Sequence, residues 1–153
     1  MSEATLATLL AERAIYRNLV AIARAMDNRD WKALGELCAA EVTADLGTGE
    51  LRGVEAIITL LRSFLDACGP TQHLLGNVLI EVQGERASSR AYVSDMHLGS
   101  GVHEGQTFST LGDYHDEWRL VAGCWRLQHR CKHNRGHVGS YAVLGPGPDH
   151  WRA

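Results

Sequence analysis

Ionisable side chains alternate with apolar ones in the segment RAYVSDMHL, residues 90–98. Every second side chain of a strand lies on the same face, so Asp95 and His97 share a face with Ala91 and Val93. A carboxylate and an imidazole are groups that move protons in enzymes, and burying either without a partner costs a few kcal/mol. The pattern predicts one wall of a polar pocket. A solvated strand end would give the same pattern.

Two more positions could place a carboxylate and an imidazole near such a wall. Asp27 ends the first apolar-periodic segment, on the same side as Tyr16 and Val20. Asp27 could instead be an ordinary exposed residue of the last helical turn, because carboxylates are seldom buried without a partner. His73 follows the turn at Pro70 and opens a strand. A lone histidine there is more often a structural hydrogen-bonding group than a catalyst.

Another predicted strand carries Thr110, Gly112 and Tyr114 on one face. Glycine within a strand often marks the close approach of another group. We therefore expect Gly112 to leave room for a ligand, with Thr110 and Tyr114 beside it.

The segment HRCKHNRGH, residues 129–137, resembles a metal site at first sight. Strand alternation puts His129, Cys131 and His133 on one face, with His137 beyond a glycine. Residues two apart on one strand are about 6–7 Å apart, which strains a shared tetrahedral ion. We expect no metal here.

The elements that must position these residues follow from hydrophobic period and turn residues. Apolar residues at three-and-four spacing predict a long first helix, Asp30 is placed to cap a short second one, and Gly69 and Pro70 end a third. Long alternating segments follow as an antiparallel meander. The expected fold is α+β, a cone-shaped, curved, mixed but mostly antiparallel sheet wrapped around three N-terminal helices. The expected helices are 5–26, 31–37 and 54–68, and the expected strands are 41–46, 72–82, 87–98, 107–121 and 124–133.

Size and composition limit the partners. The 153 residues suit one domain, 1–153, and the formal charge of −3 leaves no basic field for nucleic acid. No window approaches the roughly 18 apolar residues of a membrane span, and no secretory signal is apparent, so we expect a cytoplasmic protein. The four cysteines form no CxxC pair, and we expect no disulfide.

Three stretches carry a resemblance to a known family: AMDNRDW at the end of the first helix, TQHLLGN at a strand opening, and the hairpin GDYHDEWRLVAGCWRL. With the order of elements, they resemble the SnoaL-like branch of the nuclear-transport-factor-2-like, cystatin-like cone fold. Within it the chain is most similar to the group of scytalone dehydratase, hexachlorocyclohexane dehydrochlorinase and bile-acid 7α-dehydratase. The resemblance covers almost the whole chain.

That resemblance implies a catalytic pair of Asp27 and His73, and it adds Asp95, His97 and Arg130 as pocket residues. Tyr114 and Tyr16 complete our candidates for acid or oxyanion donors and pocket walls. Two positions depart from the family pattern. A lysine of the dehydrochlorinase is replaced by Ile22, which weakens a dehalogenase interpretation, and a tyrosine of scytalone dehydratase is replaced by Met26. Arg130 also lies on the opposite face from Trp125 and Leu127, unless a bulge shifts the strand.

The implied activity is that of a cofactor-independent lyase, in the first place a dehydratase acting on a small cyclic or polycyclic apolar molecule. A polyketide-type cyclase or double-bond isomerase using the same pair is the alternative enzyme, and a non-catalytic binding or assembly domain is the third hypothesis. The resemblance also implies a homo-oligomer, a dimer or trimer. Residues 139–153, rich in Gly and Pro, either cover the cone mouth as a lid or pack along its outside.

Overall fold

A six-stranded sheet forms most of the computed structural model, which describes residues 3–151. The strands lie in the order β2-β1-β6-β5-β4-β3. Only the β1–β6 contact is parallel, and the other neighbours are antiparallel. The expected α+β class and the curved, mostly antiparallel sheet with three helices are confirmed. The elements are α1 (Glu3–Asp27), α2 (Trp31–Glu36), β1 (Cys38–Asp45), β2 (Glu50–Arg52), α3 (Val54–Leu65), β3 (Thr71–Gln83), β4 (Arg86–Leu98), η1 (Gly101–His103), β5 (Thr107–Val121), β6 (Cys124–Gly139) and η2 (Tyr141–Val143).

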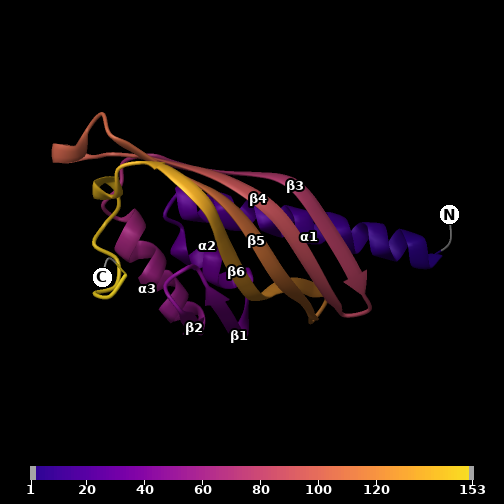
Figure 1. Ribbon diagram of the computed structural model, residues 1–153. Coiled ribbons are helices and arrows are strands. Elements are labelled where there is room, and N and C mark those ends of the chain that lie inside the picture. Colours follow the sequence, from indigo (N-terminus) through magenta and orange to yellow (C-terminus); the bar gives the residue numbers. More distant parts are fainter. Residues whose placement is uncertain (1–2, 152–153) are drawn as a thin grey trace.

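The long strands curve over the helices, and α1 runs beneath β3 to β6 (Figure 1). One stripe of α1 enters the core, with Ile15, Leu19 and Ile22 almost fully buried. They belong to the same apolar cluster as Trp118 and Leu127 on the inner face of the sheet. The three-and-four spacing of α1 therefore matches its buried stripe from Ile15 onward, whereas Leu6, Leu9 and Leu10 are exposed. Within residues 3–151 no helix is long and apolar enough to cross a membrane.

Several element boundaries differ from the expectation. Asp30 caps α2 as predicted, since its carboxylate accepts a hydrogen bond from the backbone of Ala33. The short strand β2 was not expected. Helix α3 ends at Leu65, before the expected Cys68. Strand β6 extends six residues beyond the expected end because its pairing with β5 continues to Gly139.

A bulge in β6 resolves the conflict over the faces of this strand. Trp118 of β5 lies opposite Leu127, whereas the preceding Glu117 lies opposite His129, so Gln128 is an extra residue. An extra residue reverses the alternation of side chains beyond it. Leu127 before the bulge and Arg130 after it are therefore both buried inside the cone.

Residues 140–151 fold back onto α3 (Figure 1). The backbone N–H of Gly145 donates to the carbonyl of Phe64 at 2.8 Å. The ring of Trp151 packs edge-on against the ring of Phe64, with centroids 4.7 Å apart. This segment thus lies beside α3 and contributes side chains to the cavity described below.

Candidate active site

A cavity of about 840 Å³ lies between the helices and the concave face of the sheet. Apolar residues of the helices, among them Ile22, Met26 and Leu60, line one side. Polar residues of the strands line the other. A largely apolar cavity with a few convergent polar groups is the usual form of a small-molecule site. The polar wall includes His73, Asp95, His97, Thr110, Tyr114, Arg130, Lys132 and His137.

Sheet register brings the central residues of this wall together. His73 of β3 lies opposite Asp95 of β4, and Asp95 lies opposite Thr110 of β5. Thr110 in turn lies opposite His137 of β6. These four residues form one row across the concave face, and His97 lies on the same face as Asp95, as the alternation on β4 predicts.

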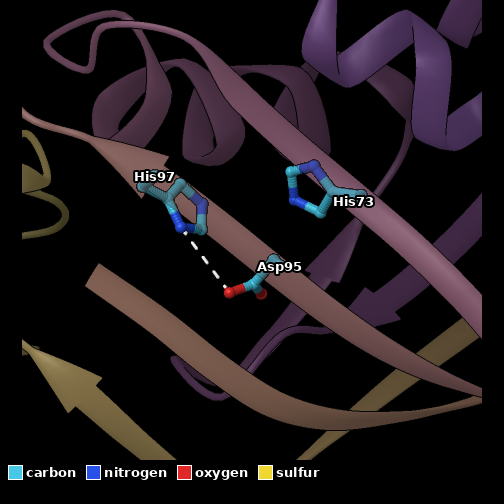
Figure 2. Close-up of side chains that lie close together, drawn as sticks. All are labelled: His73, Asp95 and His97. Atoms are coloured by element: carbon cyan, nitrogen blue, oxygen red, sulfur yellow. Dashed lines mark ion pairs between the residues drawn. The ribbon is translucent and has the colours of Figure 1, made fainter. Parts of the chain in front are cut away.

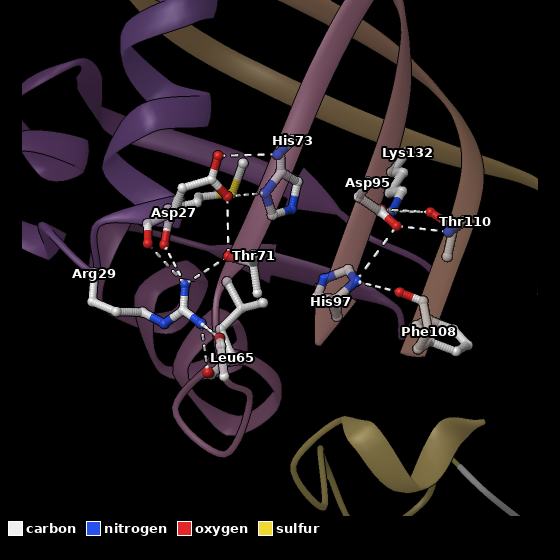
Figure 3. Close-up of polar contacts among 12 residues, drawn as sticks. Asp27, Arg29, Leu65, Thr71, His73, Asp95, His97, Phe108, Thr110 and Lys132 are labelled. Carbon is white, nitrogen blue, oxygen red and sulfur yellow. Dashed lines mark hydrogen bonds and ion pairs between the residues drawn. The ribbon is translucent and has the colours of Figure 1, made fainter. Parts of the chain in front are cut away.

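Asp27 and His73 form a hydrogen-bonded pair at this wall (Figure 3). Asp27 Oδ1 lies 2.7 Å from His73 Nδ1, and Asp27 Oδ2 accepts the backbone N–H of His73 at 3.0 Å. Burial raises the pKa of Asp27, but the hydrogen bonds from His73 and Thr71 outweigh it, so this pKa lies below its ordinary value. The ionised carboxylate fixes the proton on Nδ1, and His73 Nε2 points away from Asp27 (Figure 3).

Arg29 holds the surroundings of this pair in place. Its guanidinium donates to the carbonyls of Met26 and Leu65, at the ends of α1 and α3, and to the hydroxyl oxygen of Thr71 at 2.9 Å. That hydroxyl then donates to Asp27 Oδ1 at 3.0 Å. Figure 3 shows Arg29 beneath Asp27, joining the two helix ends to the start of β3. Sequence analysis did not identify Arg29 or Thr71, because the distant groups they join meet only in the folded chain.

Asp95 is held by a second network. Its carboxylate accepts the backbone N–H and the hydroxyl of Thr110 at 2.6 and 2.5 Å, and the ammonium of Lys132 lies 2.8 Å away. Burial raises the pKa of Asp95, but the charge and hydrogen bond of Lys132 outweigh it, so this pKa is lowered. Asp95 is therefore an anion near neutral pH and an unsuitable proton donor.

Sequence analysis missed Lys132. Lys132 follows Cys131 in the chain. Its side chain points inward only because of the bulge at Gln128. Gly112 also contributes, because a Cβ there would lie 2.7 Å from Lys132 Cε and 2.6 Å from Val93 Cγ1. The expectation that Gly112 leaves room for a ligand is wrong. The space is occupied by the lysine side chain that crosses toward Asp95.

His97 places a second imidazole next to His73. The two rings are edge-on, with centroids 5.5 Å apart. His97 Nδ1 lies 3.1 Å from the carbonyl oxygen of Phe108, which can only accept, so Nδ1 carries the proton. Burial lowers the pKa of His97, which favours its neutral form. The neutral ring then has a lone pair on Nε2.

His73, Asp95 and His97 also lie close enough to be considered as metal ligands (Figure 2). One possible ligand atom from each lies within 4.8 Å of the others. The surroundings do not fit a metal, however, because Asp95 already accepts three hydrogen bonds and one comes from the Lys132 ammonium. A metal would have to displace that cation.

Arg130 is buried, as its assignment to the pocket requires. Its guanidinium forms a bidentate ion pair with Asp116, at 2.8 and 2.7 Å, and lies 4.0 Å from the centroid of the Tyr114 ring. Arg130 and Tyr114 both line the cavity. The guanidinium is thus already paired, and its direct contribution is to the packing of Tyr114.

The assignment of Tyr16 to the pocket is wrong. Its side chain is 48% exposed and is not among those lining the cavity. Tyr16 follows the core residue Ile15 by one position, a rotation of about 100° around the helix. It also precedes Ile22, the first cavity residue of α1, by almost two turns.

The histidines of HRCKHNRGH are divided among separate contacts. His129 Nδ1 lies 2.7 Å from the hydroxyl of Thr43, and the His133 ring packs against His115, with centroids 4.6 Å apart. His137 lines the cavity instead. Among the described residues, the single group of three possible metal ligands is the one in Figure 2 and includes none of these.

Comparisons with solved structures show the same fold. A hexachlorocyclohexane dehydrochlorinase of type 2 has a TM-score of 0.77 at 17% identity, over 93% of this chain and 96% of that one. A provisionally named scytalone dehydratase from Novosphingobium aromaticivorans has a TM-score of 0.78 at 20% identity, over 93% of this chain and 95% of that one. A provisionally named aromatic ring hydroxylase from the same organism has a TM-score of 0.76 at 24% identity, over 85% of this chain and 93% of that one.

At these identities the structural likenesses establish the fold and not the reaction. A comparison with proteins of curated function found no match. The sequence profile of the SnoaL-like domain, in contrast, matches residues 7–131, which is most of the chain. The chain therefore belongs to the SnoaL-like domain family.

Proposed function

We propose that this protein is a cofactor-independent lyase of the dehydratase type. It removes water, or another leaving group on the β-carbon, from a small cyclic or polycyclic apolar molecule. The observation that carries this proposal is the pairing of Asp27 with His73 at 2.7 Å on the wall of a largely apolar cavity. The names of the dehydratase and dehydrochlorinase with the same fold agree with it.

In this proposal His73 is the general base. With its Nδ1 proton directed to Asp27, His73 uses the lone pair of Nε2 to take a proton from carbon. The ionised Asp27 then stabilises the imidazolium, and the bonds from Thr71 and the His73 backbone keep the carboxylate from turning. The electron pair of the broken C–H bond forms a C=C bond, and the β C–O bond breaks. The His73 imidazolium returns its proton to the departing hydroxide, which leaves as water.

The tail contributes a cover to this reaction. Tyr141, Leu144 and Trp151 line the cavity, and the ring of Tyr141 packs against Phe108 of β5 and His137 of β6. Because such a cover excludes water from the cavity, the electrostatic interaction between Asp27 and the imidazolium becomes stronger. We therefore propose that the tail, expected at residues 139–153, is a lid rather than an outer strap; residues 152 and 153 lie outside the described part of the chain.

The experiment is a turnover assay with a panel of β-hydroxy ketones built on six-membered and fused rings. Formation of the conjugated ketone is followed by ultraviolet absorbance, and mass spectrometry identifies the product. Loss of one water supports the dehydratase, and an isomer of unchanged mass supports the isomerase instead. Ligand binding without any conversion across the panel would favour the non-catalytic domain.

Replacing His73 by alanine should lower the turnover rate about 10²–10⁴-fold, since general base catalysis contributes that much. The matched control is His103→Ala, because His103 lies on the η1 loop outside the cavity. Circular dichroism and thermal melting establish that both variants are folded. Equal rates for the two variants would contradict the assignment of His73.

A further inference from the structure

Tyr114 has a hydroxyl group that the fold leaves unused. Its side chain is only 4% exposed and lines the cavity. In the described part of the chain the hydroxyl makes no hydrogen bond, and since no fully buried side-chain oxygen there lacks a partner, this oxygen is accessible from the cavity. A hydroxyl donor of this kind, on a largely buried side chain and open to a cavity, is available to a ligand.

Lys132 lies directly opposite Tyr114 across β5 and β6 and lines the same cavity. Its ammonium has three hydrogens. Within residues 3–151, two are directed to acceptors, Asp95 Oδ2 at 2.8 Å and Thr110 Oγ1 at 2.9 Å. The third is left for a bound molecule.

The charges around these donors are balanced. Lys132 is paired with Asp95, and Arg130 with Asp116. Burial raises the pKa of Tyr114, which keeps its hydroxyl protonated. A neutral site with two hydrogen-bond donors suits a carbonyl oxygen better than a carboxylate or phosphate, whose full charge would be left without a counter-ion.

The donors and the proposed base belong to the same stretch of wall. The carboxylate of Asp95 is within 4.8 Å of a His73 ring nitrogen and 2.8 Å from the Lys132 ammonium. A small ring that meets Lys132 with one atom can therefore meet His73 with another.

We propose that Tyr114 and Lys132 bind the carbonyl oxygen of a cyclic ketone whose α-carbon faces His73. This inference rests on the proposed function. When His73 takes the α-proton, the C–H electron pair moves into a C=C bond and the carbonyl π pair moves onto oxygen. The two donors stabilise the enolate that forms. If the β-carbon carries a hydroxyl, the enolate re-forms the carbonyl and expels the hydroxyl as hydroxide. The His73 imidazolium then gives this hydroxide a proton, and water leaves.

Two measurements with matched probes test the site without knowledge of the natural substrate. Calorimetry compares the affinity of β-tetralone, a bicyclic ketone with acidic α-hydrogens, with that of tetralin, the same ring system without the oxygen. Proton NMR in D₂O then follows exchange of the α-hydrogens of β-tetralone. The wild-type protein should bind the ketone more tightly than the hydrocarbon and should catalyse the exchange.

Tyr114→Phe is the cleanest variant, because it removes a hydroxyl that bonds nothing in the described chain and should leave folding intact. It should lower the affinity for β-tetralone about fivefold, lower the exchange rate about 10²-fold, and leave tetralin binding unchanged. The matched control is Tyr92→Phe, on the exposed face of β4, which should change none of these values.

Lys132→Met alone leaves Asp95 without its counter-ion, so the informative variant is Asp95→Asn combined with Lys132→Met. It removes both charges and keeps an amide that can bond Thr110. It should lower ketone affinity and exchange as Tyr114→Phe does.

The outcomes separate the two proposals. Exchange that is abolished by His73→Ala but unaffected by Tyr114→Phe and by the double variant would overturn this inference and leave the proposed function standing. Ketone preference that depends on Tyr114 without any exchange would support the oxygen site and overturn the proposed base. Equal wild-type affinities for β-tetralone and tetralin would also overturn the oxygen site.

Discussion

Lys132→Met should change the sign of the pH dependence that Asp95 gives to stability. Asp95 is 1% exposed, and Lys132 is the single cation that bonds it among the described residues. Removing one partner of a buried ion pair costs about 3–5 kcal/mol, because the other charge stays buried without compensation. We expect a loss of this size in the free energy of unfolding at pH 7.

The sign follows from the pKa of Asp95 in each protein. In the wild type this pKa lies below its ordinary value of 3.8, so Asp95 stabilises the fold above that value and ceases to do so as the pH falls through the lowered pKa. In the variant, burial is left as the main influence and raises the pKa above 3.8. The folded state then binds the proton more readily than the unfolded chain, so acidification restores stability.

Urea unfolding at pH 7 and pH 5 measures this effect. The difference between wild type and Lys132→Met should be smaller at pH 5, where the buried carboxyl takes up a proton. Asp95→Asn combined with Lys132→Met is the control, because it carries no titrating group at this site and should show no such pH effect. A loss that is equal at both pH values in Lys132→Met would refute the reasoning.

Two further substitutions probe the residues that position the site. Arg29→Met should lower the free energy of unfolding by at least about 2 kcal/mol, because the guanidinium bonds Met26, Leu65 and Thr71. Arg29→Lys should recover only part of this loss, and full recovery by lysine in urea unfolding would contradict the bracing role of the guanidinium. Gly112→Ala should cost about 1–3 kcal/mol, since its Cβ would lie 2.6 Å from Val93 Cγ1. Gly76→Ala is its control, with nothing within 4 Å of the added methyl group, and thermal melting should separate the two.

Apart from the short strand β2, the order of the helices and strands could be predicted from the sequence because its signals are local. Helical spacing identifies the buried stripe of α1 from Ile15 onward, and Asp30 caps α2 through a bond three residues away. Alternation on β4 places Asp95 and His97 on one face, and the structure turns that face inward. The family resemblance implied that Asp27 and His73 form a pair, and in the structure Asp27 Oδ1 lies 2.7 Å from His73 Nδ1. No local signal in the sequence joins two residues 46 positions apart.

Tertiary structure alone decided which side chains complete the wall. The bulge at Gln128 depends on how β6 pairs with β5, and that single extra residue turns Arg130 and Lys132 into the cone. The path of Lys132 to Asp95 depends in addition on the missing side chain of Gly112 in another strand. Tyr16 is exposed because packing decides which stripe of α1 faces the sheet. Helical and strand periods determine what alternates along a segment, whereas the direction in which each face points depends on contacts between segments far apart in the chain.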